Sequence, residues 1–302
     1  MKPAPFVHHA PRSVEEAVGV LGQVGHDGKI LAGGQSLIPI LNMRLASPAH
    51  LVDINRVAGL DTVEVTDDAV RIGALVRHAQ LERHDGAYAA LPLLRQALVN
   101  VAHPAIRNRG TTVGSIAHAD AAGEMPAILA LTDGVVEATG SGGTREIAAP
   151  DFFLGALETS LAPDELATAV RFRRFPAGTA TAFAESARRH GDYAMAGVAA
   201  AVTVVDGVIE RATASFVSVT DVPTVLDLTE AIGGREPVDA DLEAAAEAVR
   251  QHVEPEADIH ASAEYRRMLA GELARRVLAQ AAGQAAGQAA GQAATTKGST
   301  SR

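Results

Sequence analysis

The chain of 302 residues contains no cysteine and no tryptophan, and its remaining aromatic residues are seven phenylalanines and three tyrosines. Without cysteine, it cannot form a disulfide, a thiolate-bound zinc site or a thiolate-bound iron–sulfur cluster. Because aromatic residues are scarce, aliphatic side chains must fill the core. The formal net charge of −10 argues against a general nucleic-acid binder, since such proteins need a basic surface.

Long apolar segments are also missing. No apolar run approaches the roughly 20 residues that a membrane-spanning helix needs. The first residues include Pro3, Pro5, His8 and His9 in place of the basic start and apolar core of a secretory signal. We therefore expect a soluble, cytoplasmic protein that is long enough for two or three compact units.

The most informative stretch that is present covers residues 29–39, where an apolar run meets Gly33-Gly34 and is followed by a hydroxyl and a second apolar segment. A strand, a glycine turn and a helix in this order present backbone N–H groups to a phosphate. Glycine tolerates positive φ and has no side chain that would block a ligand. A Gly-Gly after a strand can also be only a turn.

A second glycine-containing stretch, residues 107–115, lies about eighty residues further on. Two such loops in one domain could clamp the two ends of a pyrophosphate. The hydroxyls of Ser36, Thr111 and Ser115 are candidates for phosphate contacts, or else they cap turns and helices. The side chains of Arg107 and Arg109 would add positive charge there, or else form solvated or packing ion pairs.

Three acidic or imidazole side chains follow the second stretch. Glu124 can accept hydrogen bonds from a ribose, or it can stabilise a helix N-terminus. His118 and Asp120 do not make a metal site by themselves, because a site needs three or four convergent ligands. The chain also lacks the nucleophile elbow of serine hydrolases, the phosphate loop of kinases and a full Gly-x-Gly-x-x-Gly.

The pattern of apolar residues divides the chain into three units and a tail. Residues 1–59 read as a small α/β unit, 60–175 as a longer α/β unit, and 176–280 as α+β, with strands followed by helices. The last expected helix covers residues 263–280. Residues 281–302 repeat Gln-Ala-Ala-Gly and are expected to be a frayed helix end that runs into disorder.

Within the third unit, Gly191-Asp192-Tyr193 is an aromatic-bearing turn. Tyr193 could lie over a planar ring, or it could pack on its own sheet.

Five short motifs follow one another along the chain at residues 32–37 (AGGQSL), 51–54 (LVDI), 107–111 (RNRGT), 117–120 (AHAD) and 191–194 (GDYA). In these motifs the chain resembles the FAD-binding medium subunit of molybdenum hydroxylases, the family that includes the medium subunit of carbon monoxide dehydrogenase and the flavin subunits of xanthine-type dehydrogenases. The resemblance covers roughly residues 3–280.

The resemblance implies a vanillyl-alcohol-oxidase-type FAD-binding domain in two α/β parts, closed by a C-terminal α+β domain. It implies FAD as the cofactor of this chain, with a large molybdopterin-binding subunit and a small [2Fe–2S] subunit as partners in a dimer of heterotrimers. Electrons would pass from the clusters to the FAD and then to an external acceptor. The acceptor stays open among NAD, oxygen, quinones and dye-like carriers. The absence of cysteine fits clusters that lie on another chain.

The resemblance also implies which residues bind the cofactor. The first pyrophosphate loop matches Lys29, Ile30, Leu31, Ala32, Gly33, Gly34, Gln35 and Ser36. The remaining matches are Thr111, Gly114 and Ser115 in the second loop, His118 and Asp120 in the next motif, Glu124 at the ribose, Leu166 near the flavin and Tyr193 against the isoalloxazine ring. No catalytic residue and no metal ligand is expected on this chain.

The sequence departs from the family at two places. Thr112-Val113 replace the usual Ile-Gly of the second loop, and valine cannot adopt all the backbone conformations of glycine. Ala184-Glu185 stand where many relatives have a lysine. Two other functions stay open: a stand-alone flavin oxidase that acts directly on a substrate, and a non-enzymatic nucleotide-binding protein.

Overall fold

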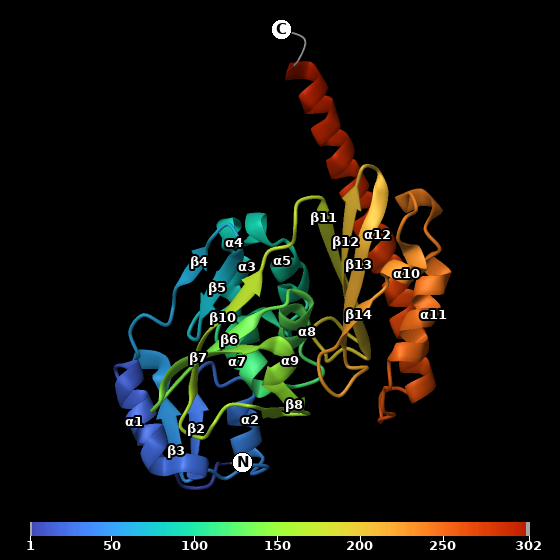
Figure 1. Cartoon of the computed structure of the whole chain (residues 1–302). Coiled ribbons are helices and arrows are strands. Elements are labelled where there is room, and N and C mark those ends of the chain that lie inside the picture. The colour runs from blue at the N-terminus through green and yellow to red at the C-terminus, as the bar shows by residue number, and fades with distance from the viewer. Residues whose placement is uncertain (1, 300–302) are drawn as a thin grey trace.

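Three sheets follow one another along the chain, and a two-stranded ribbon lies beside the second (Figure 1). The computed structural model describes the backbone of residues 2–299 and the side chains of residues 2–289, except that of Asp239. Within this part no helix is both long and apolar enough to cross a membrane.

The N-terminal unit is a parallel sheet in the order β1-β3-β2, with α1 packed on it. Ser13 caps α1, because its hydroxyl accepts from the backbone N–H of Glu16. Ala17, Val18 and Leu21 are its buried residues. The elements are β1 (Val7–His9), α1 (Val14–Val24), η1 (Gly25–Asp27), β2 (Gly28–Leu31), α2 (Leu37–Asn42), β3 (His50–Asp53) and η2 (Ile54–Arg56).

The second unit is an antiparallel sheet in the order β4-β5-β10-β6-β7. Its strands are β4 (Val63–Val65), β5 (Ala69–Gly73), β6 (Val135–Gly140), β7 (Gly143–Ala148) and β10 (Leu166–Arg173), and the ribbon consists of β8 (Phe153–Gly155) and β9 (Glu158–Thr159). Its helices are α3 (His78–Glu82), α4 (Asp85–Ala90), α5 (Leu93–Leu98), α6 (Pro104–Arg107), α7 (Thr112–His118), α8 (Glu124–Leu131) and α9 (Ala149–Phe152).

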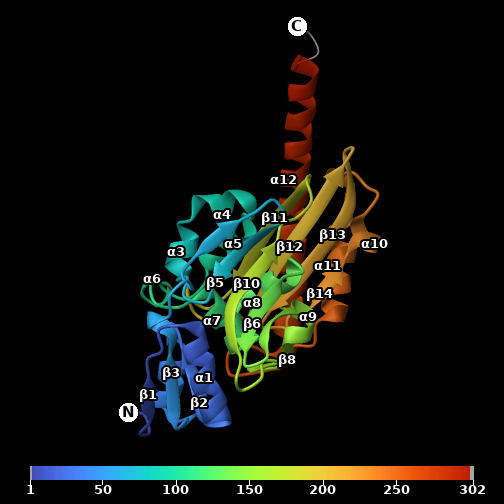
Figure 2. The same cartoon turned by 60° about the vertical axis from the view of Figure 1, so that its left-hand side comes forward.

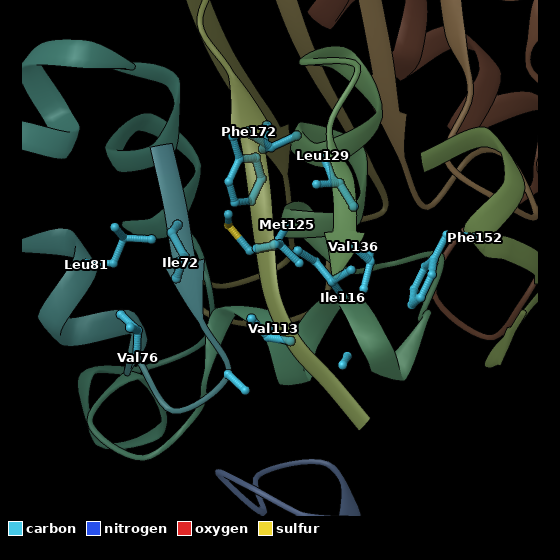
Figure 3. Close-up of a cluster of buried hydrophobic side chains, with 14 of the residues drawn as sticks. Ile72, Val76, Leu81, Val113, Ile116, Met125, Leu129, Val136, Phe152 and Phe172 are labelled. Atoms are coloured by element: carbon cyan, nitrogen blue, oxygen red, sulfur yellow. The ribbon is translucent and has the colours of Figure 1, made fainter. Parts of the chain in front are cut away.

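Aliphatic side chains fill the core between this sheet and helices α7 and α8, as the shortage of aromatic residues predicted (Figure 3). Ile72 and Val136 come from the sheet, and Ile116 and Met125 come from the helices; all four are fully buried. Beyond Glu124 at its first position, helix α8 is apolar on all sides, because the third sheet covers its opposite face.

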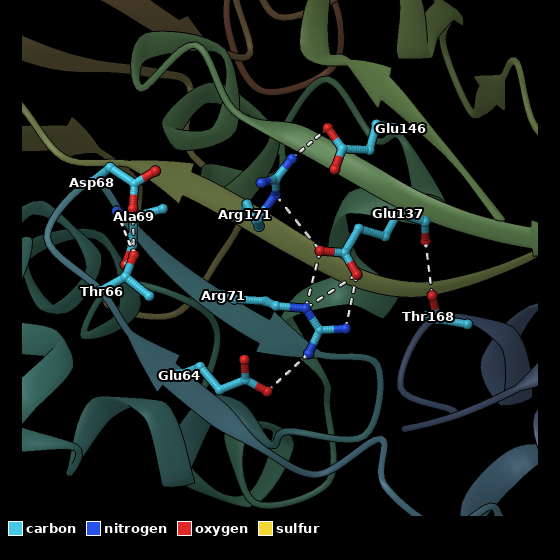
Figure 4. A network of polar contacts seen from close by, with 9 residues as sticks. All are labelled: Glu64, Thr66, Asp68, Ala69, Arg71, Glu137, Glu146, Thr168 and Arg171. Atoms are coloured by element: carbon cyan, nitrogen blue, oxygen red, sulfur yellow. Dashed lines mark hydrogen bonds and ion pairs between the residues drawn. The ribbon is translucent and has the colours of Figure 1, made fainter.

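The other face of the second sheet is charged (Figure 4). Arg71 on β5 donates to both carboxylate oxygens of Glu137 on β6, with the shortest distance 2.7 Å from Nη2 to Oε2. Arg171 on the intervening β10 pairs with Glu137 and with Glu146. Because these charges alternate along each strand with buried residues such as Ile72, a register slip of one residue would bury them.

The third unit is an antiparallel sheet that is covered on both faces. Helix α8 contacts β12 and β13 on one face, and α12 and α11 cover the other (Figure 2). Ala199 and Ala201 accordingly belong to the core of the second unit, whereas Val198 and Val202 pack toward α12. The elements are β11 (Thr179–Ser186), β12 (Ala196–Val205), β13 (Val208–Val217), β14 (Val225–Asp227), α10 (Thr229–Ile232), η3 (Pro237–Asp239), α11 (Leu242–His252) and α12 (Ala263–Ser299).

The prediction of a frayed tail was wrong for the residues that the structure describes. Helix α12 continues without a break from Ala263 to Ser299 and projects beyond the sheet (Figures 1 and 2). Ala281, Ala282 and Ala285 are buried against the third unit. Alanine and glutamine favour helices, and a methyl group suffices to fill a close contact. Residues 300–302 lie outside the described part, and the domain boundaries at residues 60, 176 and 281 stay predictions.

Candidate functional site

The first glycine segment has the predicted geometry. Strand β2 ends at Leu31, a turn follows, and α2 begins at Leu37. Gly34 has a φ of +73°, which an L-amino acid rarely adopts. Within the described part of the chain, the backbone N–H groups of residues 33–36 donate to no protein acceptor. Ser36 makes no capping bond. The turn therefore presents a row of free N–H groups.

The two glycine segments touch each other. A Cβ on Gly33 would lie 2.5 Å from the carbonyl oxygen of Arg109 and 2.8 Å from the Cα of Gly110. Only glycine permits this approach. Residues about eighty positions apart are thus brought together, as the pairing of the two stretches predicted.

A cavity of about 380 Å³ opens beside this contact. The first turn, the end of β3 and the second segment all contribute to its wall. Its lining consists of Leu31, Ala32, Gly33, Gly34, Gln35, Ile38, Pro39, Asp53, Asn55 and Arg109. The free N–H groups of the turn and the charge of Arg109 favour an anionic ligand, whereas the carboxylate of Asp53, which also lines the cavity, opposes it.

The second segment differs from the predicted loop, because residues 112–115 form the first turn of α7. Thr111 caps this helix: its hydroxyl accepts from the backbone N–H of Gly114 at 3.1 Å. A Cβ on Gly114 would lie only 2.5 Å from the same oxygen. The helical conformation of Val113 explains how the chain accepts valine where the family usually has glycine.

Arg107 and Arg109 have different environments. Arg107 is buried; its Nε donates to Glu82 at 3.0 Å and its Nη1 to the carbonyl oxygen of Val101 at 3.0 Å. Arg107 is therefore a packing residue, which is one of the two alternatives that the sequence left open. Arg109 is exposed and lines the cavity.

Three of the predicted residues gather where α8 meets the third unit. Burial raises the pKa of Glu124 to about 8, and the charges of Glu185 and Asp120 contribute. Tyr193 has a raised pKa as well, because its phenol is partly desolvated and because the charges of Asp120 and Glu124 act on it. Glu185, on β11, has a pKa raised by burial to about 7, and its Oε2 is buried without a partner among the described residues.

Tyr193 lies in a turn that packs closely against the second unit. Its side chain is 72% exposed, so it does not pack on its own sheet. Gly191 has a φ of +84°, and a Cβ there would lie 2.5 Å from the His103 ring and 2.8 Å from the Ala102 carbonyl oxygen. This contact holds the turn of the third unit against the second.

The remaining predicted residues have mixed positions. His118 ends α7 and is half-buried, and the Asp120 carboxylate accepts from the backbone N–H of Ala122. Lys29 is exposed on β2. Leu166 is only 1% exposed and its side chain belongs to the core, so contact with a ligand would need its main chain.

Two polar residues beside the glycine segments were missed by the sequence reasoning. Asn55 lines the cavity, and Arg77 bonds to both Asn55 and the main chain of Arg109. Asn55 directly follows the Leu-Val-Asp-Ile motif at residues 51–54, and this position in the sequence could have indicated its role. Nothing in the sequence around Arg77 indicates its contacts, because they come from segments that lie far away along the chain.

Comparisons with known proteins agree with this arrangement. Residues 4–174 match the FAD-binding domain of molybdopterin dehydrogenases, and residues 181–281 match the C-terminal domain of carbon monoxide dehydrogenase flavoproteins. The chain is 40% identical, over 93% of its length and 96% of the relative, to the 6-hydroxypseudooxynicotine dehydrogenase complex subunit alpha of Paenarthrobacter nicotinovorans.

Solved structures show the same fold. Carbon monoxide dehydrogenase from Hydrogenophaga pseudoflava matches with a TM-score of 0.89 and 36% identity, over 94% of this chain and 99% of that chain. Quinoline 2-oxidoreductase from Pseudomonas putida 86 matches with a TM-score of 0.88 and 34% identity, over 95% of this chain and 100% of that chain. The fold class predicted from the sequence is confirmed. The chain therefore belongs to the family of FAD-binding medium subunits of the molybdenum hydroxylases, which are oxidoreductases.

Proposed function

We propose that this chain holds the FAD pyrophosphate between its two glycine segments and passes electrons within a complex of three kinds of subunit. The single observation that carries the proposal is the contact of Gly33 with Arg109 and Gly110. It places a turn with free N–H groups beside a second glycine-containing segment, at the edge of a cavity.

The residues present fit such a group. A pyrophosphate needs several converging donors, and backbone N–H groups supply them without the bulk of side chains. The cavity is lined by that turn and by Arg109. A Cβ at Gly33 would press the two segments apart, so the cradle depends on glycine.

The cofactor-binding set predicted from the sequence is part of this proposal. Residues 29–36, with Thr111, Gly114 and Ser115, would surround the phosphates. Glu124 would accept from the ribose. Tyr193 would cover the ring, with His118, Asp120 and Leu166 nearby. The exposure of Tyr193 and the proximity of Asp120 and Glu124 to its phenol support this assignment.

FAD, when bound, supplies the exchange between one-electron clusters and a two-electron external acceptor. We propose that the clusters lie on a small [2Fe–2S] subunit and that a large molybdopterin subunit carries the substrate. The relative from Paenarthrobacter nicotinovorans is itself named as a subunit of a complex, and the chain has no cysteine for clusters. The proposed assembly is a dimer of heterotrimers in the cytoplasm.

The absorption spectrum of the purified full chain, alone and with its partner subunits, tests the proposal. We expect flavin bands and the release of FAD on denaturation, with substrate turnover only in the complex. A purified chain without a flavin, and unable to take up added FAD, would contradict the proposal and favour a nucleotide-binding protein without redox activity. Turnover by the isolated chain would favour a stand-alone flavin oxidase.

A further inference from the structure

Arg77, between β5 and α3, connects the two glycine segments through its guanidinium group. Its Nη1 donates to the carbonyl oxygen of Arg109 at 2.6 Å, and its Nη2 donates to Oδ1 of Asn55 at 2.6 Å. The Nδ2 of Asn55 donates to the carbonyl oxygen of Ala32 at 2.9 Å. A continuous path of hydrogen bonds therefore runs from the first glycine turn to the second segment.

Asp53 fixes the orientation of Asn55 in this path. Its Oδ1 accepts from the backbone N–H of Asn55 at 3.0 Å and from Nδ2 at 2.6 Å. Since both Ala32 and Asp53 offer only acceptors, the NH₂ group of Asn55 must face them. The amide oxygen is thereby left for Arg77.

The fork of the guanidinium suits this bridge. Within the described part of the chain, Arg77 has no carboxylate within 4.0 Å, so its two donors serve neutral oxygens from segments that lie 22 and 32 positions away. Burial and the charge of Arg109 lower the pKa of Arg77, whereas the charge of Asp53 raises it. A lysine has one compact ammonium group and does not present a planar pair of donors.

The start of α3 also contacts the second segment, through the main chain and through the side chains of His78 and Thr112. His78 donates its backbone N–H to the carbonyl oxygen of Gly110 at 2.9 Å. Gly33 then lies against Arg109 and Gly110 by van der Waals contact without a hydrogen bond. The path through Arg77 and Asn55 thus supplies directional bonds at the place where the two segments otherwise only touch.

We propose that Arg77 is a positioning residue that holds the two glycine segments at the spacing which a bound pyrophosphate requires. This inference rests on the proposed function of the site. It assigns no contact between Arg77 and the ligand; Arg77 acts through Asn55 and the main chain of Arg109.

The test is FAD and ADP binding to the flavin-free full chain, measured by titration for the wild type and for R77Q, R77K and N55A. R77Q should weaken both ligands by about 10- to 100-fold, the range expected for losing hydrogen bonds from a charged group. R77K should lose nearly as much affinity for both ligands, because one ammonium group cannot replace the two planar donors of the guanidinium group. The double variant R77Q/N55A should lose no more affinity than the more severely weakened of the two single variants, since both residues act in one path of hydrogen bonds.

R83A is the matched control. Arg83 directly follows α3 and is exposed, and in the described part of the chain its side chain donates only to the carbonyl oxygen of Ala79 in that helix. R83A should therefore bind both ligands as the wild type does. Wild-type affinity in R77Q or R77K would overturn the inference. A fall of more than about 5 °C in the thermal midpoint of flavin-free R77K would overturn it too, since Arg77 would then be a general stability residue. A wild-type chain that binds neither FAD nor ADP would instead refute the proposed function.

Discussion

Gly33 lies so close to Arg109 that a methyl group on its Cα would come within 2.5 Å of the Arg109 carbonyl oxygen. The partner atom belongs to the backbone, so it cannot rotate away as a side chain would. Any residue other than glycine at position 33 must therefore move one of the two segments that we assign to the pyrophosphate.

G33A should consequently abolish the retention of FAD through purification, measured as the ratio of flavin absorbance to protein absorbance. The matched control is G22A, because Gly22 lies in α1 and a Cβ there would have no other atom within 4 Å. G22A should retain flavin and gain up to about 1 kcal/mol of stability from the helix propensity of alanine. Full flavin occupancy in G33A would refute the assignment of the first loop.

Tyr193 offers a second test of the site. Its side chain is 72% exposed, so Y193A should leave the thermal stability of the flavin-free chain unchanged. Loss of an aromatic contact with the ring should weaken FAD binding by roughly 2- to 10-fold, as expected for about 0.5–1.5 kcal/mol. Y193F keeps the ring and should bind nearly as the wild type does. Flavin fluorescence quenching measures both variants; equal affinity in Y193A would argue against stacking.

The carboxyl of Glu124 predicts a dependence of stability on pH. Burial, followed by the charge of Glu185, raises its pKa from 4.5 to about 8. The folded chain therefore binds this proton more tightly than the unfolded chain. Its contribution to stability is fully present below pH 4.5 and is lost as the pH rises through 8.

E124Q carries no ionisable group at this position, so it should lose less stability than the wild type between pH 5 and pH 9. At pH 9, the free energy of unfolding of flavin-free E124Q should exceed that of the wild type by roughly 1–3 kcal/mol. Chemical denaturation across this pH range measures the difference. E210Q, at an exposed position on β13, is the control, and an identical pH profile in E124Q would contradict the prediction.

Arg107 should contribute to the stability of the folded chain. Its buried guanidinium pairs with Glu82 and bonds to the carbonyl oxygens of Val101 and Ala102. R107A leaves these groups without a partner, so it should destabilise the flavin-free chain by about 3–5 kcal/mol. Thermal unfolding measures this loss. A stable R107A that has lost FAD would instead identify Arg107 as a ligand contact.

The extended helix α12 can be tested by truncation. Deleting residues 281–302 removes the buried methyl groups of Ala281, Ala282 and Ala285, at roughly 0.8 kcal/mol each, so it should cost about 2 kcal/mol of stability. Deleting residues 290–302 keeps these contacts and should leave the thermal midpoint within about 2 °C of the full chain. Equal midpoints for the two truncations would show that the alanine contacts contribute nothing.

The sequence by itself determined the local elements. Ser13 begins α1 because a hydroxyl at that position caps a free N–H, and Gly34 forms a turn because it accepts positive φ. Both effects act within a few residues, so a pattern of letters reveals them. The motif order likewise identified the family. The same reasoning took Thr111–Ser115 for a loop, although Thr111 carries a recognisable capping hydroxyl.

Only the tertiary structure decided how distant segments meet. The contact of Gly33 with Arg109, the bridge of Arg77 and the grouping of Glu124 with Tyr193 each join residues more than twenty positions apart. The order of helix α12 beyond residue 280 has a similar cause, because its alanines become buried only when the third sheet is in place. Such contacts depend on the packing of whole sheets and helices, and the local pattern around each residue does not contain that information.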